Sequence, residues 1–240
     1  SKLLSFCKKN QIKIDTICCL KNSNKLSKQK KSFSVQNSFK LSDQSQSFIN
    51  HIKKNRYNII YFLDYGPFSL RYAEIILKKN KYSIIAIANK EMLIAGGSLL
   101  IKMIKKTNNT LVPLDSEHFS LQKIKFNNSS IENIYITASG GPFYFDKNIN
   151  IDKVKINDVL KHPKWKMGLN NSIDSSNFIN KVLEVYELSH IYEIELKKIH
   201  FLVSKEAYLH SIVVFKDNTI SLNCFDNDML ITLTSPLKKF

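Results

Sequence analysis

The first half of the chain alternates short apolar runs with segments of helical periodicity, and this pattern constrains the fold more than any other feature. The run Ile59–Leu63 is rich in β-branched and aromatic residues, and a second apolar run covers residues 83–88. After each run, residues 70–79 and 91–106 place apolar side chains three and four positions apart, as an amphipathic helix does. Strands and helices that alternate over short connections predict a parallel sheet wound by helices, whose ligands bind beyond the carboxyl ends of the strands.

The second half has a different order of apolar runs and helical segments, and we place a boundary between two domains near residue 107. Residues 110–114 form a short apolar run that leads into an acidic segment, and a long helix is expected from about 175 to 196. The predicted fold class is α/β, with one domain over 1–107 and another over 108–240. The other expected elements are helices at 2–9, 48–54 and 156–161, a loop passing into a helix over 21–31, loop with one short strand over 32–45, and strands at 14–20, 133–138, 199–203, 211–215 and 219–224.

The formal net charge of +16 over 240 residues raises the question of a nucleic-acid partner, because lysine and arginine neutralise phosphates. Nearly every cation is lysine, and Arg56 and Arg71 are the only arginines. Base readout and bidentate phosphate contacts favour arginine. We therefore interpret the charge as a solvated lysine surface that also attracts anionic substrates, and expect no nucleic-acid partner. A nucleic-acid binder is kept as a third alternative, which steeply salt-dependent DNA binding would mark.

The sequence indicates neither a membrane protein nor a disulfide framework. It contains no apolar run of the roughly 18 to 20 residues needed to cross a bilayer, and residues 1–7 lack the apolar core of a signal peptide. Among the four cysteines, Cys18 and Cys19 are adjacent, and no C-x-x-C motif occurs. This usage is typical of reduced thiols, so we expect a cytoplasmic protein without a membrane partner.

Two acidic residues, Asp115 and Glu117, follow the run at 110–114. In extended backbone, side chains two positions apart point to the same side. Neighbouring carboxylates repel each other unless a cation neutralises them, and Mg²⁺ or Mn²⁺ prefers such oxygen ligands. The ordinary alternative to a metal site is a solvated turn that carries the two carboxylates. The adjacent His118 fits a structural role as well as a role in a site.

Three polar residues, Asn180, Lys181 and Glu184, share one face of the helix expected at 175–196, because they lie one, three and four positions apart. A surface ion pair is the ordinary explanation, and the apolar residues nearby favour a site instead. Ser175, at the expected start of the helix, either caps it or holds a phosphate together with exposed backbone N–H groups.

Two segments between these acidic residues are also unusual. The turn Ser139-Gly140-Gly141-Pro142 uses two of the six glycines, either for positive φ or for close approach to a ligand to which Ser139 donates. Trp165, the only tryptophan, lies two residues before Met167 in a segment expected to be mobile. It is either a core anchor or part of a lid that shields a reaction from water.

Taken in order, these motifs resemble the 1-deoxy-D-xylulose 5-phosphate reductoisomerase family. Each motif is weak alone, but the set recurs in family order, and from residue 138 on at ungapped spacing, with weaker similarity over 1–240. The matching motifs are Ala88-Asn89-Lys90-Glu91, Asp115-Ser116-Glu117-His118, Ala138-Ser139-Gly140-Gly141-Pro142-Phe143, His162-Pro163-x-Trp165-x-Met167-Gly168, Ser172-Ile173-Asp174-Ser175, Asn180-Lys181-x-Leu183-Glu184, His210-Ser211 and Asp228-Met229.

The resemblance implies a Rossmann-like NADPH-binding domain over 1–107, incomplete at its first strand, followed by an α/β catalytic domain over 108–240. It also implies a reaction, the NADPH-dependent and divalent-metal-dependent rearrangement and reduction of 1-deoxy-D-xylulose 5-phosphate to 2-C-methyl-D-erythritol 4-phosphate. That reaction is a step of non-mevalonate isoprenoid biosynthesis in bacteria and plastids. A homodimer and a cytoplasmic or plastid-type compartment are expected with it.

The resemblance further assigns roles to individual residues. The ligands of Mn²⁺ or Mg²⁺ would be Asp115, Glu117 and Glu184. The catalytic residues would be Glu117, His162, Lys181 and His210. The substrate contacts would be Ser116, Ser139, His162, Trp165, Ser175, Asn180, Lys181 and Glu184, and the cofactor contacts Asn24, Asn89, Lys90, Glu91 and Met229.

The sequence also departs from the family pattern. None of its six glycines forms the family's G-x-T-G-x-x-G loop, so the pyrophosphate of the cofactor lacks its helix N-terminal site. Ser204-Lys205-Glu206-Ala207 stands where the family has His-Pro-Gln-Ser, which removes a hydroxyl expected to hold phosphate. We therefore expect a fragment that lacks its termini, with the alternative of an eroded, non-catalytic remnant that no longer binds NADPH.

Overall fold

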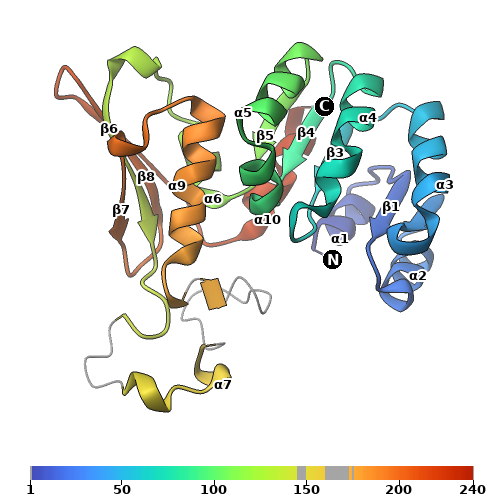
Figure 1. The fold of residues 1–240 in the computed structure, drawn as a ribbon, viewed down its shortest axis with the longest axis horizontal. Helices are drawn as coiled ribbons and strands as arrows, with labels where there is room; N and C mark the ends of the chain where they lie inside the picture. Colours follow the sequence, from blue (N-terminus) through green and yellow to red (C-terminus); the bar gives the residue numbers. More distant parts are fainter. Residues whose placement is uncertain (1, 145–149, 160–172, 175, 240) are drawn as a thin grey trace. The chain divides into compact units, whose positions relative to one another are not determined.

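The computed structural model describes residues 2–144, 150–159, 173–174 and 176–239 (Figure 1). The chain forms two compact units. The first unit contains Ser1–Met92, Lys102–Val112 and Leu230–Phe240, and the second contains Leu93–Ile101 and Pro113–Met229. Each unit is thus assembled from separate segments of the chain.

Short parallel strands form the first unit. β1 (Thr16–Cys19) pairs in parallel with β2 (Asn37–Lys40), and β3 (Ile59–Phe62) pairs in parallel with β4 (Ile84–Ile87), which β5 (Thr110–Pro113) flanks. β4, in the middle of its sheet, is buried along its whole length, which accounts for its continuous apolar sequence. The α/β class expected from the alternation of strands and helices is confirmed.

Helices connect these strands, and most match the expected segments. α4 (Leu70–Lys79) coincides with its predicted range, and α5 (Lys90–Lys106) bends at Gly97, whose φ of 46° is left-handed. No helix in the described part of the chain is both long enough and apolar enough to cross a membrane. The other helices of this unit are α1 (Lys2–Lys9), α2 (Ser23–Ser32), α3 (Leu41–Lys54) and α10 (Met229–Thr234).

Helix α3 begins earlier than the sequence pattern predicts. The expectation of loop over most of 32–45 is wrong for its last residues, because α3 begins at Leu41. The polar residues that follow Leu41 offer no apolar periodicity. Leu41 is nevertheless buried, and the Gln44 side chain accepts a hydrogen bond from the Lys40 backbone N–H at 2.8 Å. A local hydrogen bond ahead of the first turn, rather than patterning, therefore helps to start this helix.

The second unit is built on a four-stranded mixed sheet in the order β7-β6-β8-β9. The central strand β6 (Ile131–Ala138) runs parallel to β7 (Ile199–Val203) and antiparallel to β8 (Leu209–Phe215), which pairs antiparallel with β9 (Ile220–Cys224). The helices α6 (Ser116–Leu121) and α9 (Ile179–Tyr192) both belong to this unit, as does the short helix α7 (Ile156–Val159).

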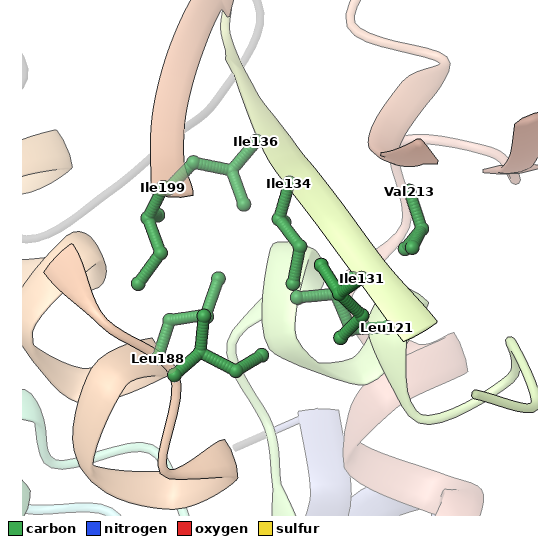
Figure 2. Close-up of a cluster of buried hydrophobic side chains, with 8 residues drawn as sticks. Leu121, Ile131, Ile134, Ile136, Leu188, Ile199 and Val213 are labelled. Carbon is green, nitrogen blue, oxygen red and sulfur yellow. The ribbon is translucent and has the colours of Figure 1, made fainter. Parts of the chain in front are cut away.

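Apolar side chains from the sheet and from both helices form the core of the second unit. Ile134 of β6 is fully buried and pairs in register with Val213 of β8 and Ile199 of β7. Figure 2 shows these side chains together with Leu188 of α9 and Leu121 of α6. The core thereby fixes α6 and α9 on the same face of the sheet.

Helix α9 is shorter than predicted at both ends. It begins at Ile179 and ends at Tyr192, so the limits of the expected range 175–196 are wrong. The flanking residues Phe178 and Glu193 have left-handed φ values of 62° and 55°, which a continuous right-handed helix does not accommodate. Neither residue is glycine, so the sequence carried no signal for these limits.

Replacing Leu188 by alanine should lower the free energy of unfolding by about 2–5 kcal/mol, because its side chain is fully buried in this core. Leu99→Ala is the matched control: Leu99 is also helical but 70% exposed, so its effect should stay within about 0.5 kcal/mol. Denaturant unfolding followed by circular dichroism measures both variants. Equal losses would contradict the role of Leu188 in the core.

Candidate metal and substrate site

The acidic segment after β5 is the capped start of a helix rather than an extended loop. Asp115 has extended backbone angles and caps α6, and its side chain accepts from the Glu117 backbone N–H at 3.3 Å. The expected extended geometry is therefore wrong from Ser116 on. The two carboxylates still lie close together, because the cap and the first turn of a helix are adjacent. α6 has only six residues, too few for its periodicity to be recognised.

One face of α9 carries Asn180, Lys181 and Glu184. Asn180 Nδ2 donates to Glu184 Oε1 and Lys181 Nζ donates to Glu184 Oε2, each at 2.5 Å. Lys181 Nζ also donates to Glu117 Oε1 at 2.7 Å. A buried ammonium group therefore joins α9 to α6.

The carboxylates of Asp115, Glu117 and Glu184 converge on one region. Each offers one oxygen, and these oxygens lie within 4.8 Å of one another. Glu117 is 8% exposed and Glu184 is 1% exposed, so solvent does little to screen their repulsion. Several hard oxygen donors at this spacing suit a divalent cation such as Mg²⁺ or Mn²⁺. Lys181 already bridges two of the three carboxylates, so the cluster accommodates positive charge, and the donor set fits such an ion.

Burial and neighbouring charges change the proton affinity of this cluster. Burial first, and then the charge of Glu184, raise the pKa of Glu117 to about 7, against the lowering effect of Lys181. For Lys181, burial alone would lower the pKa, but attraction to Glu117 and Glu184 outweighs it and raises the pKa above its ordinary value. Lys181 is therefore charged, and Glu117 can take up or release a proton near neutral pH.

Two serines expected at the site belong to the same unit. Ser116 Oγ donates to Glu117 Oε2 at 2.5 Å. Ser139 is half-buried and directly follows β6, where the chain turns through Gly140 and Gly141. Their φ values of 94° and 70° explain why glycine occupies both positions.

His210 is buried in β8 and stacks on Phe225. The ring centroids are 3.8 Å apart, and His210 Nε2 donates to the Phe225 carbonyl at 3.2 Å. Burial lowers the pKa of His210, and the charge of Lys181 lowers it further. Asp115 and Glu184 act on it in the opposite sense, so His210 lies within electrostatic reach of the acidic cluster.

Two of the five residues expected to contact a cofactor, Asn89 and Glu91, form hydrogen bonds with Gly66. Asn89 caps α5 by accepting from the Met92 backbone N–H, and its Nδ2 donates to the Gly66 carbonyl, both at 2.8 Å. Glu91 Oε2 accepts from the Gly66 N–H at 3.4 Å, which joins the end of β4 to the turn after β3. The other three are Asn24, exposed in the first turn of α2, Lys90, the first residue of α5, and Met229, the first residue of α10.

Three expected site residues, His162, Trp165 and Ser175, and Met167 of the expected lid lie outside the described residues. Sequence reasoning missed Glu187, which is 1% exposed on α9 and belongs to a second group with Asp115 and His118 whose ligand atoms lie within 4.8 Å. Its position three residues after Glu184 was the available signal, because residues that far apart share a helical face.

Known proteins similar to this chain are 1-deoxy-D-xylulose 5-phosphate reductoisomerases. Residues 111–192 match the family described as 1-deoxy-D-xylulose 5-phosphate reductoisomerase C-terminal domain. The chain is 36% identical over 260 aligned positions to that enzyme from Pelagibacter ubique, covering 97% of this chain and 66% of the relative. It is 42% identical over 151 positions to the one from Clostridium novyi, covering 62% of this chain and 39% of the relative. The chain thus spans less than two thirds of these curated relatives.

Solved structures of 1-deoxy-D-xylulose 5-phosphate reductoisomerases share the fold of this chain. The reductoisomerase from Zymomonas mobilis in complex with NADPH aligns with a TM-score of 0.75 at 26% identity, over 99% of this chain and 60% of that one. A reductoisomerase in complex with NADPH, fosmidomycin and magnesium aligns with a TM-score of 0.77 at 24% identity, over 98% of this chain and 60% of that one. The fold expected from the resemblance is confirmed.

The environment of His118 predicts a pH-dependent stability. Burial alone would lower its pKa, but the hydrogen bond to Asp115 and the charge of Glu187 raise it from 6.5 to about 9. Because the pKa is higher in the folded protein, protonation of His118 adds to the free energy of unfolding. This contribution is complete below pH 6.5 and is lost as the pH rises through about 9. With a chelator present, the free energy of unfolding should fall by at least about 1 kcal/mol more in the wild type than in His118→Gln between pH 6.5 and 9. Denaturant unfolding at stepped pH measures this, and parallel curves would contradict it.

Proposed function

This chain belongs to the 1-deoxy-D-xylulose 5-phosphate reductoisomerase family, and from that premise we propose that it takes part in the rearrangement and NADPH-dependent reduction of 1-deoxy-D-xylulose 5-phosphate. The product would be 2-C-methyl-D-erythritol 4-phosphate, made for non-mevalonate isoprenoid biosynthesis in a reducing compartment, the bacterial cytoplasm or a plastid. The observation that carries the proposal is the convergence of three carboxylates and one lysine from α6 and α9. All four cysteines are free thiols, which suits such a compartment.

The metal site would consist of Asp115, Glu117 and Glu184, holding Mg²⁺ or Mn²⁺. Such an ion, when bound, supplies a Lewis acid that polarises neighbouring oxygens of a ketose phosphate and orients them. The protein's own contribution is to hold the carboxylates together in advance, since Asp115 is fixed as a helix cap and Glu184 by Asn180 and Lys181. The low exposure of Glu117 and Glu184 limits the access of water to these oxygens.

The described residues also supply proton-transfer and substrate contacts. Glu117 Oε1 and Lys181 Nζ lie 2.7 Å apart, and we assign this pair to the exchange of a proton with a bound hydroxyl. His210 would act as the neutral histidine of the site. Ser116, Ser139 and Asn180 would donate to substrate oxygens. His162, Trp165 and Ser175 complete the proposed set from outside the described residues, with Trp165 in a lid.

The segment 1–107 would bind NADPH. Parallel strands followed by helices support this, because such folds bind nucleotides beyond the carboxyl ends of the strands, where Asn89, Lys90 and Glu91 lie. Asn24 stands at the amino end of α2 among exposed lysines that suit a phosphate. Met229 would contact the cofactor from the second segment, 108–240. The rival proposal is an eroded, non-catalytic remnant that no longer binds NADPH. The departure at Ser204-Lys205-Glu206-Ala207, where the family has His-Pro-Gln-Ser, favours it.

Oxidation of NADPH in the presence of 1-deoxy-D-xylulose 5-phosphate, with and without Mn²⁺, tests the proposed activity. Glu184→Gln should reduce the metal-dependent rate at least about 100-fold, because it removes a charged ligand while keeping the size of the side chain. Glu195→Gln is the control, since Glu195 is exposed and paired with Lys197 at 2.7 Å. Metal-independent oxidation would contradict the role of the carboxylates. A folded wild type that binds no NADPH would instead support the remnant.

We also propose that the chain forms a homodimer through the outer face of the four-stranded sheet. Leu202, Ile220 and Leu222 are 43%, 62% and 59% exposed. Register places Leu222 beside Ile212, and Ile212 beside Tyr135, on the side opposite the core. Several exposed apolar side chains on one face of a sheet favour an interaction surface.

Replacing Leu222 by glutamate should convert a dimer into a species near the 27.8 kDa mass of one chain, because it puts a charge on this face, on the edge strand β9. Leu99→Glu, at an exposed site on α5, is the control and should leave the mass unchanged. Light scattering coupled to size-exclusion chromatography measures both. A wild type with the mass of one chain would disprove the proposed dimer.

A further inference from the structure

We propose that Glu187 and His118 act as a positioning pair that orients Asp115 for metal binding. Neither residue is among the ligands or substrate contacts assigned above. Both are buried, His118 completely and Glu187 to within 1% of its surface. The inference rests on the proposed function, because it concerns how the carboxylates of that site are held.

The imidazole ring of His118 links the two elements that supply the carboxylates. Its Nδ1 lies 3.0 Å from Asp115 Oδ1, in the cap of α6. Its Nε2 lies 3.1 Å from the Glu184 backbone carbonyl of α9. Both nitrogens thus face acceptors, so the ring donates a hydrogen bond on each side. One side chain thereby fixes the carboxylate of Asp115 and the backbone that carries Glu184.

Glu187 completes this arrangement from the next turn of α9. Its Oε2 lies 3.9 Å from His118 Nε2, on the side of the ring away from Asp115. A negative charge there favours a proton on Nε2 and holds the ring in the plane that serves Asp115. Tyr192 adds a further tie, since its hydroxyl donates to the His118 carbonyl at 2.9 Å. Glu187 would therefore orient the His118 ring, and the ring would orient the Asp115 carboxylate.

A buried residue of this kind could instead serve only the packing of α6 against α9. The two roles differ in what they affect. A packing role changes stability and leaves the metal affinity of the folded protein alone. A positioning role changes the affinity for the ion, and it does so only while Asp115 has a carboxylate to position. The coupling between substitutions at Glu187 and Asp115 separates the two roles.

The test is a titration with Mn²⁺, in which free ion is measured by electron paramagnetic resonance at constant pH. Glu187→Gln keeps the volume of the side chain and should raise the Mn²⁺ dissociation constant about 10-fold or more, as loss of a supporting residue behind a metal ligand does. In an Asp115→Asn background, Glu187→Gln should cause no further change. Glu195→Gln, the exposed control on the segment after α9, should bind as the wild type does.

The possible outcomes are distinct. A folded Glu187→Gln variant whose dissociation constant stays within about twofold of the wild type overturns the proposal, as does an equal effect with and without the Asp115 carboxylate. Should Glu187→Gln fail to fold, His118→Asn, which retains only the Nδ1-side donor, is measured in the same cycle and must show the same coupling. A folded wild type that binds no Mn²⁺ would remove the metal site itself, and with it both this inference and the proposed function. Wild-type binding with unaltered variants would remove the inference alone.

Discussion

The Lys181 ammonium group between Glu117 and Glu184 is the interaction on which this arrangement depends. Two carboxylates so little exposed, and so close together, would repel each other strongly in the interior of a protein. Removing one partner of such a buried ion pair typically costs about 3–5 kcal/mol, because it leaves a charge uncompensated. Lys181 supplies that compensation from within the chain, through hydrogen bonds of 2.7 and 2.5 Å. Lys181 thereby offsets the repulsion between the two carboxylates.

The rest of the second unit holds α6 and α9 in place for this contact. A helix of six residues such as α6 does not form by itself in water. Leu121 is fully buried in the sheet core, Phe119 packs edge-on against Phe225 with centroids 5.5 Å apart, and Ser120 Oγ lies 2.6 Å from Ser211 Oγ of β8. Apolar contact, aromatic packing and a buried hydroxyl pair therefore fix the helix whose cap is Asp115. Asp115 and Glu117 therefore lie on a segment that is stable only as part of this unit.

Most regular elements could be predicted from the sequence, because periodicity is a local property. The strand Ile199–Val203 and the helix Leu70–Lys79 have the expected limits. The strand is a short run rich in β-branched and aromatic residues, and the helix repeats apolar residues every three to four positions. The limits of α9 could not be predicted, because left-handed φ at Phe178 is imposed by its surroundings and not by its side chain. The same holds for α6, which is too short to show a period.

The site could be predicted in composition but not in detail. Spacing singled out the pair Asp115 and Glu117, and helical periodicity placed Asn180 and Lys181 on one face with Glu184. The resemblance then assigned the three carboxylates to one metal site. The bond from Lys181 to Glu117 joins residues 64 positions apart, so only the folded chain reveals it. Glu187 was overlooked for a related reason: a glutamate in an amphipathic helix is ordinarily solvated, and its burial against His118 depends on the packing of two helices.

The segmental make-up of the two units has a consequence for any attempt to study them apart. The backbone changes unit after Met92, Ile101, Val112 and Met229. No single cut can therefore release either unit intact. A cut near the middle of the chain would separate the first unit from α10 and the second unit from its part of α5. Segments of the two units alternate along the polypeptide, so each unit keeps all of its segments only in an uncut chain.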